Sequence, residues 1–267
     1  MRISPLFGGA GALEARRTQV IQTGQTRPLI IGHRGAAGHA PENTQAAFRA
    51  AIQLGVDAVE FDVQFSADGE PLVFHDETLG RMAGVPARIP DYPAAALKGF
   101  DIGFRHGDQY RGERIPSVAE VADLVPPAIG LHAEVKDYEP VSEPRLERLI
   151  EELEGHGGLE RVIFSSPHEE TLAQIQKLRP SASLALLLFK AVKVPTDAAR
   201  RASLLGCRAV NPDARLVSPE LAQVCQRHHM QLFTFTVNER GTMRKLEQIG
   251  VNGFFTDYPD RLMEAAR

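Results

Sequence analysis

The chain has 267 residues, a length that suits one large domain or two small ones, and its formal net charge is −4 at pH 7. Its composition, 43% hydrophobic and 24% charged, excludes a disordered or fibrous chain, and the slightly acidic balance is not that of a nucleic-acid-binding domain. The longest apolar run, Leu184–Phe189, is far below the roughly 18 residues of a membrane-spanning helix, so we expect no transmembrane segment.

The N-terminal residues 1–27 follow neither a helical nor a strand period, and we expect a loosely ordered extension there. They lack the basic, apolar and small-residue regions of a secretory signal. The only two cysteines, Cys207 and Cys225, cannot form a disulfide framework, and both fall in helix-like stretches as core or half-buried thiols. Together these features predict a cytoplasmic protein.

From residue 29 onward, short apolar runs alternate with helical patterns, which is typical of a parallel sheet with crossover helices. The predicted strands are Leu29–Gly32, Ala58–Gln64, Pro71–His75, Leu131–Lys136, Val162–Ser165, Leu184–Leu188, Ala209–Asn211, Leu232–Val237 and Phe254–Thr256. The predicted helices are Thr44–Leu54 capped by Asn43, Val118–Leu124 with a Ser117/Glu120 capping box, Arg145–Glu154, Glu169–Leu178, Asp197–Leu205, Pro219–Arg227, and Glu239–Ile249 ended by Gly250.

The third predicted strand does not fit a parallel sheet. Only residues 65–70 separate it from the second strand, whereas a parallel crossover needs a dozen or more. The turn Ala67-Asp68-Gly69-Glu70 indicates a hairpin instead, so Pro71–His75 is expected to return as an antiparallel arm. The eight remaining strands predict an α/β fold, a (β/α)8 TIM barrel over residues 28–267.

Residues 77–116 interrupt the alternation, because they are rich in Gly, Pro, Asp and Arg and follow no period. Unpatterned stretches beyond about 15 residues usually serve a function. We therefore interpret residues 76–116 as a small insertion after the second strand, a cap segment over one end of the barrel.

Ionisable residues gather where the predicted strands end, which is where TIM-barrel active sites lie. Because strand side chains alternate, Glu60 and Asp62 share one face, and so do Glu134 and Lys136. Buried carboxylates cost several kcal/mol unless they are paired or bind a metal. Glu60, Asp62 and Glu134 therefore suit a hard divalent cation, Mg²⁺ or Ca²⁺. The simpler alternative is an ion cluster with Arg34 and Lys136.

Two histidines end the first strand and the hairpin arm, His33 and His75. Imidazole titrates near neutral pH, so a pair beside carboxylates suits a general acid and a general base better than the packed or surface role usual for histidine. His132 shares a strand face with Glu134 and is expected in the core or behind the ligands.

A cation together with Arg34 and Lys136 describes a pocket for an anion with several oxygens, and phosphate is the natural candidate. One histidine would deprotonate the nucleophile while the other protonates the leaving alkoxide. The residues alone thus predict metal-assisted phosphoester chemistry, with a non-enzymatic phosphate-binding barrel as the alternative.

An ordered set of short motifs runs from Ile30 to Arg261. The motifs are His33-Arg34-Gly35, Pro41-Glu42-Asn43-Thr44, Glu60-x-Asp62-Val63, Asp68-Gly69, His75-Asp76-Glu77-Thr78-Leu79-x-Arg81, Ile115-Pro116-Ser117, Glu134-x-Lys136, Thr236-Val237-Asn238 and Thr256-Asp257-Tyr258-Pro259. Each alone is weak, but in this order the set resembles the glycerophosphodiester phosphodiesterase family.

The resemblance implies a TIM barrel with a small insertion and hydrolysis of a small-molecule glycerophosphodiester to an alcohol and sn-glycerol 3-phosphate. The glycerol 2-hydroxyl could serve as an internal nucleophile through a cyclic phosphate, which gains from proximity. The implied roles are cation binding by Glu60, Asp62 and Glu134, acid and base catalysis by His33 and His75, and phosphate contact by Arg34 and Lys136.

Three positions depart from the family pattern: Phe235 replaces a usual Trp, His132 a common Asn, and Ser165-Ser166 a usual Ser-Phe. Phe235 is expected to line the substrate pocket on its glycerol or alcohol side. The sequence therefore does not determine which alcohol is the leaving group.

The alternative function is a lysophospholipase D-like or cyclic-phosphodiester activity at the same site. An apolar cap surface around Phe100 and Phe104 would favour the lipid substrate.

Overall fold

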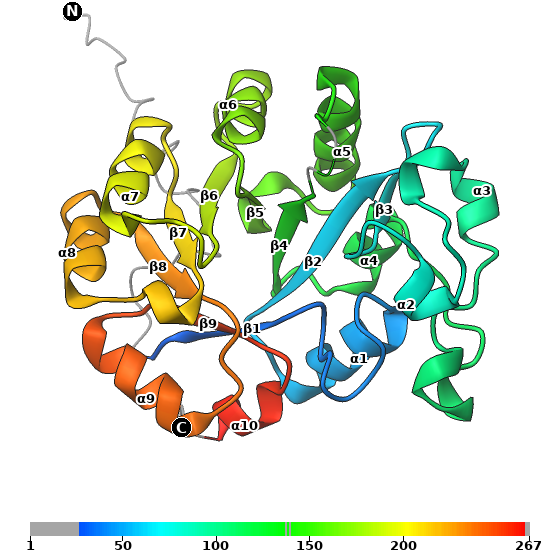
Figure 1. The fold of residues 1–267 in the computed structure, drawn as a ribbon, viewed down its shortest axis with the longest axis horizontal. Coiled ribbons are helices and arrows are strands. Elements are labelled where there is room, and N and C mark those ends of the chain that lie inside the picture. The colour runs from blue at the N-terminus through cyan, green and yellow to red at the C-terminus, as the bar shows by residue number, and fades with distance from the viewer. Residues whose placement is uncertain (1–26, 137, 139, 265–267) are drawn as a thin grey trace, which may run out of the picture.

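In the computed structural model, which describes residues 27–136, 138 and 140–264, eight parallel strands close into a barrel (Figure 1). The closure is the pairing of β1 with both β2 and β9. The barrel strands are β1 (Leu29–Gly32), β2 (Ala58–Phe65), β4 (Gly130–Val135), β5 (Val162–Ser166), β6 (Ser183–Leu188), β7 (Ala209–Pro212), β8 (Gln231–Thr234) and β9 (Gly253–Thr256). The predicted TIM barrel is confirmed.

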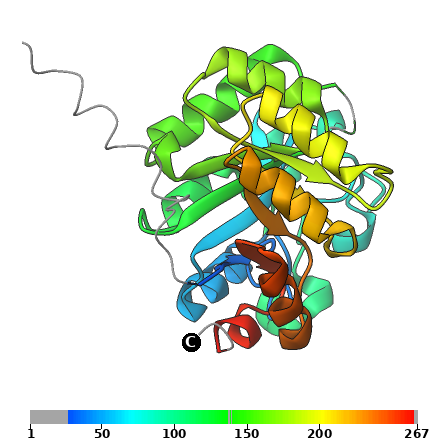
Figure 2. The ribbon, with the colours of Figure 1, turned by 90° about the vertical axis from the view of Figure 1, so that its left-hand side faces the viewer.

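Helices surround the strands, as the side view makes plain (Figure 2). Each turns an apolar stripe to the barrel, for example Leu149 of α5 and Ile175 of α6, which are fully buried. The helices outside the cap are α1 (Gln45–Leu54), α4 (Val118–Leu124), α5 (Glu143–Gly155), α6 (Glu169–Leu178), α7 (Pro195–Leu204), α8 (Pro219–Arg227), α9 (Arg240–Ile249) and α10 (Pro259–Met263).

The barrel interior has its own apolar layer, separate from the core between strands and helices. Its buried members are Ile31, Ala58, Ile163, Ala185, Ala209, Phe233 and Phe255. Because side chains alternate along a strand, the residues two and four positions beyond Ala58 also face inward. These residues are Glu60 and Asp62, so the fold directs both carboxylates into the barrel above an apolar floor.

The hairpin arm β3 (Pro71–Val73) pairs antiparallel with β2, with Val63 opposite Val73. This confirms the antiparallel return inferred from the short connection. The strand is shorter than predicted and ends at Val73, although Phe74 still donates its backbone N–H to the Asp62 carbonyl, and His75 lies beyond this last bond to β2. His75 is thereby placed over the end of β2.

The predicted cap segment forms short helices around a core of its own, at the right of Figure 1. The helices are α2 (Gly80–Ala83), η3 (Ile89–Asp91), α3 (Ala94–Leu97), η4 (Phe104–His106) and η5 (Asp108–Tyr110). The buried core is Leu72, Phe74, Leu79, Met82, Ala87, Ile89, Leu97, Ile102 and Ile115. Elements this short leave no period in the sequence, which is why the segment resembled an unstructured insertion.

Three local predictions are wrong. The strand predicted to run to Val237 ends at Thr234, so Phe235 lies beyond β8. Thr44, not Asn43, caps α1: its hydroxyl accepts the N–H of Ala47, while Asn43 has a positive φ of 58° and turns its amide toward Asp62. Cys207 lies beyond the end of α7 and not in a helix, although it is buried as expected. Cys225 lies in α8 as predicted, and the Ser117/Glu120 capping box and Gly250 C-cap are confirmed.

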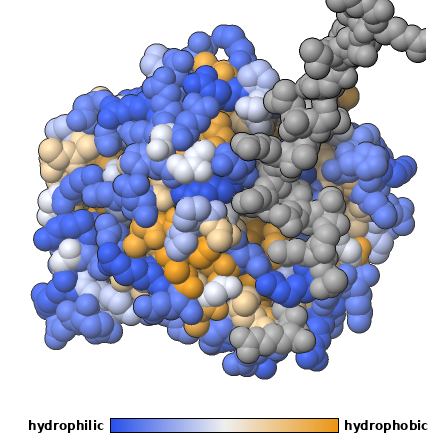
Figure 3. Space-filling view, turned by 180° about the vertical axis from the view of Figure 1, so that it is seen from behind, coloured by the Kyte–Doolittle hydropathy of each residue, from blue (hydrophilic) through white to orange (hydrophobic). Residues whose placement is uncertain are grey.

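The predicted loose extension falls almost entirely outside the described residues. Its last residue, Arg27, is held by Asp57, with both nitrogen–oxygen distances 2.8 Å. Within the described part of the chain no helix is long and apolar enough to cross a membrane. The face turned away in Figure 1 is largely hydrophilic, with hydrophobic residues gathered near its middle (Figure 3). The cytoplasmic location stays a prediction.

Candidate active site

The site lies where β1, β2 and β4 end and the hairpin arm and cap meet them. Parallel pairing of β2 with β4 sets Asp62 opposite Glu134 and Glu60 opposite His132. His33 and Arg34 follow β1 directly, and Lys136 follows β4. The register of neighbouring strands thus brings together side chains that lie far apart in the sequence.

The three predicted metal ligands form one buried group. Ligand oxygens of Glu60, Asp62 and Glu134 all lie within 4.8 Å of one another. Glu60 accepts the backbone N–H of Arg34 at 2.8 Å through Oε2, but its buried Oε1 has no hydrogen-bond partner. Unpaired buried carboxylate oxygens are costly. A hard cation prefers such oxygens, so the residues present fit a divalent cation.

Two cations neutralise part of this group. Lys136 lies 2.9 Å from Asp62 and also donates to Glu134, while Arg34 Nε lies 3.2 Å from Asp62. The ion cluster considered as the simpler alternative therefore exists for Asp62 and Glu134. It does not account for Glu60, whose side chain forms no ion pair with either cation and keeps one oxygen without a partner among the residues that the structure describes.

Burial and like charge act most strongly on Glu60. Burial, with the neighbouring Asp62 charge, raises the pKa of Glu60 to about 8. Burial would also raise the pKa of Asp62, but the charges of Lys136 and Arg34 outweigh it and hold that pKa below its usual range. The cluster thus has excess negative potential at Glu60, the condition under which a divalent cation binds and displaces a proton.

His33 is fixed by a carboxylate from the last barrel strand. Its Nδ1 lies 2.7 Å from Asp257 Oδ1, and the amide of Asn238 donates to Asp257 Oδ2 at 2.8 Å. Asn238 in turn accepts the backbone N–H of Asp257 at 2.9 Å. Because Nδ1 is engaged, Nε2 is the ring nitrogen available to a bound molecule.

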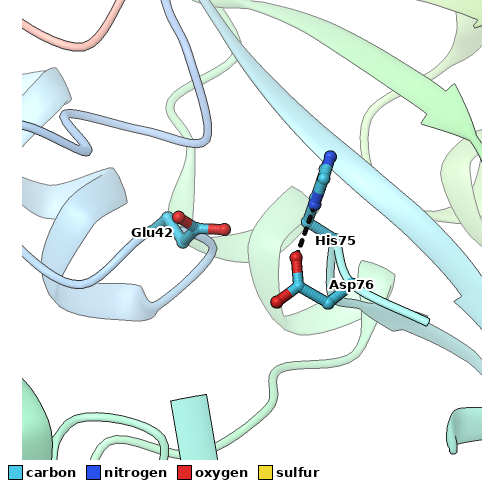
Figure 4. A group of neighbouring side chains, drawn as sticks. All are labelled: Glu42, His75 and Asp76. Atoms are coloured by element: carbon cyan, nitrogen blue, oxygen red, sulfur yellow. Dashed lines mark hydrogen bonds and ion pairs between the residues drawn. The ribbon is translucent and has the colours of Figure 1, made fainter. Parts of the chain in front are cut away.

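His75 has the same arrangement with a carboxylate from the next residue. Its Nδ1 lies 2.8 Å from Asp76 Oδ1, the contact drawn as a dashed line in Figure 4, where Glu42 faces the pair from the other side. Ligand atoms of Glu42, His75 and Asp76 also lie within 4.8 Å of one another. Both carboxylates are already paired by the guanidinium of Arg81, which makes this group an ion-pair network.

The two imidazoles differ in proton affinity. Burial alone would lower the pKa of His33, but the hydrogen bond to Asp257 and the charge of Glu60 outweigh it and raise that pKa. Burial lowers the pKa of His75, and the positive charges of Lys136 and Arg34 act in the same direction. Near neutral pH His33 is therefore the more fully protonated of the two rings and has a proton to give, while His75 is mainly neutral and has a free nitrogen to accept one.

Aromatic rings form the wall across from these groups. Phe235, just beyond β8, lies with its ring centroid 5.6 Å from that of Phe189 and 6.4 Å from that of Phe255. His132 packs beneath, 5.0 Å from Phe255, and neither of its ring nitrogens has a hydrogen-bond partner. Burial lowers the pKa of His132 to about 3, so it is a neutral core residue, as expected.

Sequence reasoning missed the residues that hold the histidines and Arg34. They are Glu42, Asp76, Arg81, Asn238 and Asp257, and all five belong to the motifs noted above. Spacing along a strand identifies residues that share a face, but it does not identify which carboxylate reaches a given imidazole across the barrel. A signal existed for Asp257 and Asn238, because both follow barrel strands at the catalytic end.

The barrel and its site define an enzyme class: TIM-barrel enzymes that act on phosphate esters. A model of the glycerophosphoryl diester phosphodiesterase family matches residues 33–261. The chain therefore belongs to this family.

Relatives of known name agree. A glycerophosphodiester phosphodiesterase of Caldanaerobacter subterraneus is 33% identical over 242 residues, 90% of this chain and 98% of that protein. One from Bacillus subtilis is 31% identical and covers 88% of this chain and 85% of its own length. Among solved structures, an Oleispira antarctica phosphodiesterase in complex with the product sn-glycerol-3-phosphate has a TM-score of 0.83 at 29% identity, covering 90% of this chain and 96% of that one.

Proposed function

We propose that this phosphodiesterase hydrolyses glycerophosphodiesters to an alcohol and sn-glycerol 3-phosphate, with a divalent cation held by Glu60, Asp62 and Glu134. The observation that carries the proposal is the buried carboxylate cluster, incompletely neutralised at Glu60 Oε1, beside two histidines that are each fixed through Nδ1. When bound, the cation supplies stabilisation of the negative charge that builds on the phosphoryl oxygens. Mg²⁺ and Ca²⁺ both suit all-oxygen ligands.

In this proposal His75 is the general base and His33 the general acid, as the directions of their pKa shifts favour. His75 Nε2 removes the proton from the attacking hydroxyl, of water or of the substrate's own glycerol. The new P–O bond forms as the bond to the alcohol breaks, and His33 Nε2 gives its proton to the leaving alkoxide. If the glycerol 2-hydroxyl attacks, water then opens the cyclic phosphate with the two roles exchanged.

Arg34 and Lys136 are proposed to contact the phosphate. An ammonium group has three N–H donors, and Lys136 directs two of them to Asp62 and Glu134. The third is available for a phosphoryl oxygen. Burial would lower the pKa of Lys136, but the charges of Asp62 and Glu134 raise it, so the group stays cationic at neutral pH.

Release of sn-glycerol 3-phosphate from purified protein tests the proposal. Activity should disappear with EDTA and return on adding Mg²⁺ or Ca²⁺. Loss of activity on chelation with no recovery by either cation, or full activity in EDTA, would contradict the assigned role of the carboxylates.

A second candidate is lysophospholipase D-like activity at the same site. It is favoured by the Phe189 and Phe235 rings, since Phe189 is 42% exposed and offers an apolar surface beside Phe235. A human lysophospholipase D is 26% identical over 88% of this chain. The cap residues support it less, because Phe100 packs against the cap core and Phe104 lies under the Arg105 guanidinium.

A panel of diesters separates the two candidates. Small polar glycerophosphodiesters and lysophospholipids are compared at equal concentration in wild type and in F235A. If lipids are the substrates, kcat/KM for them should fall most in F235A. Equal loss for every diester would assign Phe235 to the glycerol side common to all. The same panel with cyclic phosphodiesters tests the remaining alternative.

A further inference from the structure

Arg81, a residue of the cap segment, contacts two carboxylates that each hold a side chain of the site. Arg81, in α2, contacts Asp76 with Nε at 2.7 Å from Oδ2 and Nη2 at 2.9 Å from Oδ1. It also contacts Glu42, with Nη1 at 2.9 Å from Oε2 and Nη2 at 2.6 Å from Oε1. A single guanidinium therefore forms two bidentate pairs, a geometry that only arginine can provide.

The two carboxylates that Arg81 holds are those that hold His75 and Arg34. Asp76 Oδ1 lies 2.8 Å from His75 Nδ1, and Glu42 Oε1 accepts from Arg34 Nη1 at 2.8 Å. Arg81 Nη2 contacts both of these same oxygens. One nitrogen thus contacts both the oxygen that holds the His75 imidazole and the oxygen that holds the Arg34 guanidinium.

An ordinary exposed salt bridge contributes little to stability or function, and Arg81 itself is 47% exposed. The two carboxylates that it contacts, however, are mostly buried. The side chains of Glu42 and Asp76 are only 17% and 23% exposed, and burial would raise the pKa of both, but the hydrogen bonds of Arg81 lower them instead. Arg81 thereby contributes, with Arg34 and His75, to stabilising the ionised form of both carboxylates.

We propose that Arg81 is a positioning residue, which through Asp76 holds His75 with Nε2 directed at the substrate and through Glu42 holds Arg34 against the phosphate. The proposal rests on the proposed function for its kinetic consequences, though not for the geometry. It also assigns a role to the cap segment, whose helix α2 delivers this guanidinium to the barrel.

The kinetic test uses R81K and R81Q, with R111A as matched control. Arg111 is a cap arginine that pairs only with Asp108 in its own turn among the contacts described. Loss of a partner that orients a catalytic or ligand group typically changes activity about 10–100-fold. We expect kcat to fall by that factor in both Arg81 variants, KM to rise, and R111A to stay within about twofold of wild type. Unchanged kcat in R81K and R81Q would overturn the proposal.

A D76N background separates positioning from general destabilisation. If Arg81 acts on His75 through Asp76, R81Q should lower kcat far less in D76N than in wild type, while the rise in KM through Glu42 persists. If R81Q lowers kcat by the same factor in D76N as in wild type, Arg81 does not act on His75 through Asp76.

A spectroscopic readout is independent of turnover. In wild type, ¹⁵N-labelled His75, assigned with H75Q, should show one neutral tautomer with the proton on Nδ1, and R81K should show a mixture of tautomers. If wild type shows this signature without hydrolysing diesters, the proposed function fails and the positioning role stands. An unchanged tautomer in R81K overturns the positioning role even if the enzyme is active.

Discussion

His33 and Asp257 are 224 residues apart in the chain, yet His33 Nδ1 and Asp257 Oδ1 are 2.7 Å apart. The contact exists because β1 pairs with β9, with Gly32 opposite Thr256, one residue before each partner. Closing the barrel therefore completes the site. The bond engages Nδ1 and leaves Nε2 as the ring nitrogen that carries the proton in the proposed mechanism.

The first prediction separates the acid from the base. H33A and H75A should each lower kcat by about 10²–10⁴ on diesters of ordinary alcohols, as expected for lost acid–base catalysis. With a glycerol phosphodiester of p-nitrophenol, which leaves without protonation, H33A should regain most of its activity and H75A should not. Steady-state kinetics with both substrates, and thermal unfolding to verify folding, check this.

The opposite rescue, with H75A regaining activity on the activated diester, would exchange the two roles. Equal activity of either variant and wild type on the ordinary diester would remove that histidine from the mechanism.

The second prediction concerns pH. The proposed mechanism requires neutral His75 and protonated His33. His75 has a pKa below the usual 6.5, so activity should fall as the pH drops through that lowered value. His33 has a pKa above 6.5, so activity should fall again as the pH rises through that raised value.

The profile of kcat/KM should therefore be bell-shaped with its limbs on either side of about 6.5. H75Q should lose the acidic limb from its residual activity and H33Q the alkaline limb. An acidic limb that persists in H75Q would assign that limb to another group.

The third prediction tests the carboxylate cluster by stability. Adding Mg²⁺ or Ca²⁺ should raise the Tm of wild type, because a ligand that binds only the folded state stabilises it by mass action, by about 2.7 kcal/mol at 100 times Kd. E60Q should abolish this rise. In EDTA at neutral pH, E60Q should be about as stable as wild type, because the raised pKa of Glu60 already favours a neutral side chain there and glutamine is neutral too.

D108N is the control, since the Asp108 side chain is 91% exposed in the cap and distant from the cluster in the sequence. It should respond to the cation like wild type. A full rise in Tm for E60Q would remove Glu60 from the proposed ligand set.

The fourth prediction uses the neutral buried His132. Its pKa is about 3 when folded, against 6.5 when exposed. Below about pH 6.5 the unfolded chain binds a proton that the folded chain does not, so stability falls with decreasing pH by up to about 1.4 kcal/mol per unit, and is unaffected above it. The H132L variant lacks this titrating group, so its stability should not show this part of the pH dependence.

Urea unfolding in EDTA at pH 7 and pH 5 provides the check. From pH 7 to pH 5 wild type should lose about 2 kcal/mol more than H132L, which also removes the two unpaired ring nitrogens of His132 from the core. Equal losses in the two proteins would mean that His132 becomes protonated in the folded state.

The barrel could be predicted from the sequence because its strands are buried apolar runs with clear bounds. β1 (Leu29–Gly32) is as predicted, and the short link between β2 and β3 identified the hairpin. The carboxylate group could be predicted because Glu60 and Asp62 lie two residues apart on one strand and so share a face. These features are local, so the alternation of residues along one strand, or the length of one connection, is enough to predict them.

The supports of the site could not be predicted in the same way. The contacts of Asp257 with His33 and of Arg81 with Glu42 join segments far apart in the chain. Asn43 shows the limit most clearly: its side chain suits a helix cap, but the structure uses its amide to bind Asp62 at 2.8 Å and leaves the cap to Thr44. Tertiary contact outweighed local propensity there.

The central claim is that the enzyme breaks the bond between the phosphate and the alcohol and releases sn-glycerol 3-phosphate. ³¹P NMR of glycerophosphocholine incubated with the purified protein and Mg²⁺ or Ca²⁺ follows both directly. The account predicts that the diester signal is replaced by that of sn-glycerol 3-phosphate, with free choline, and that EDTA prevents the change. Formation of phosphocholine and glycerol, or the same conversion in EDTA, would contradict it.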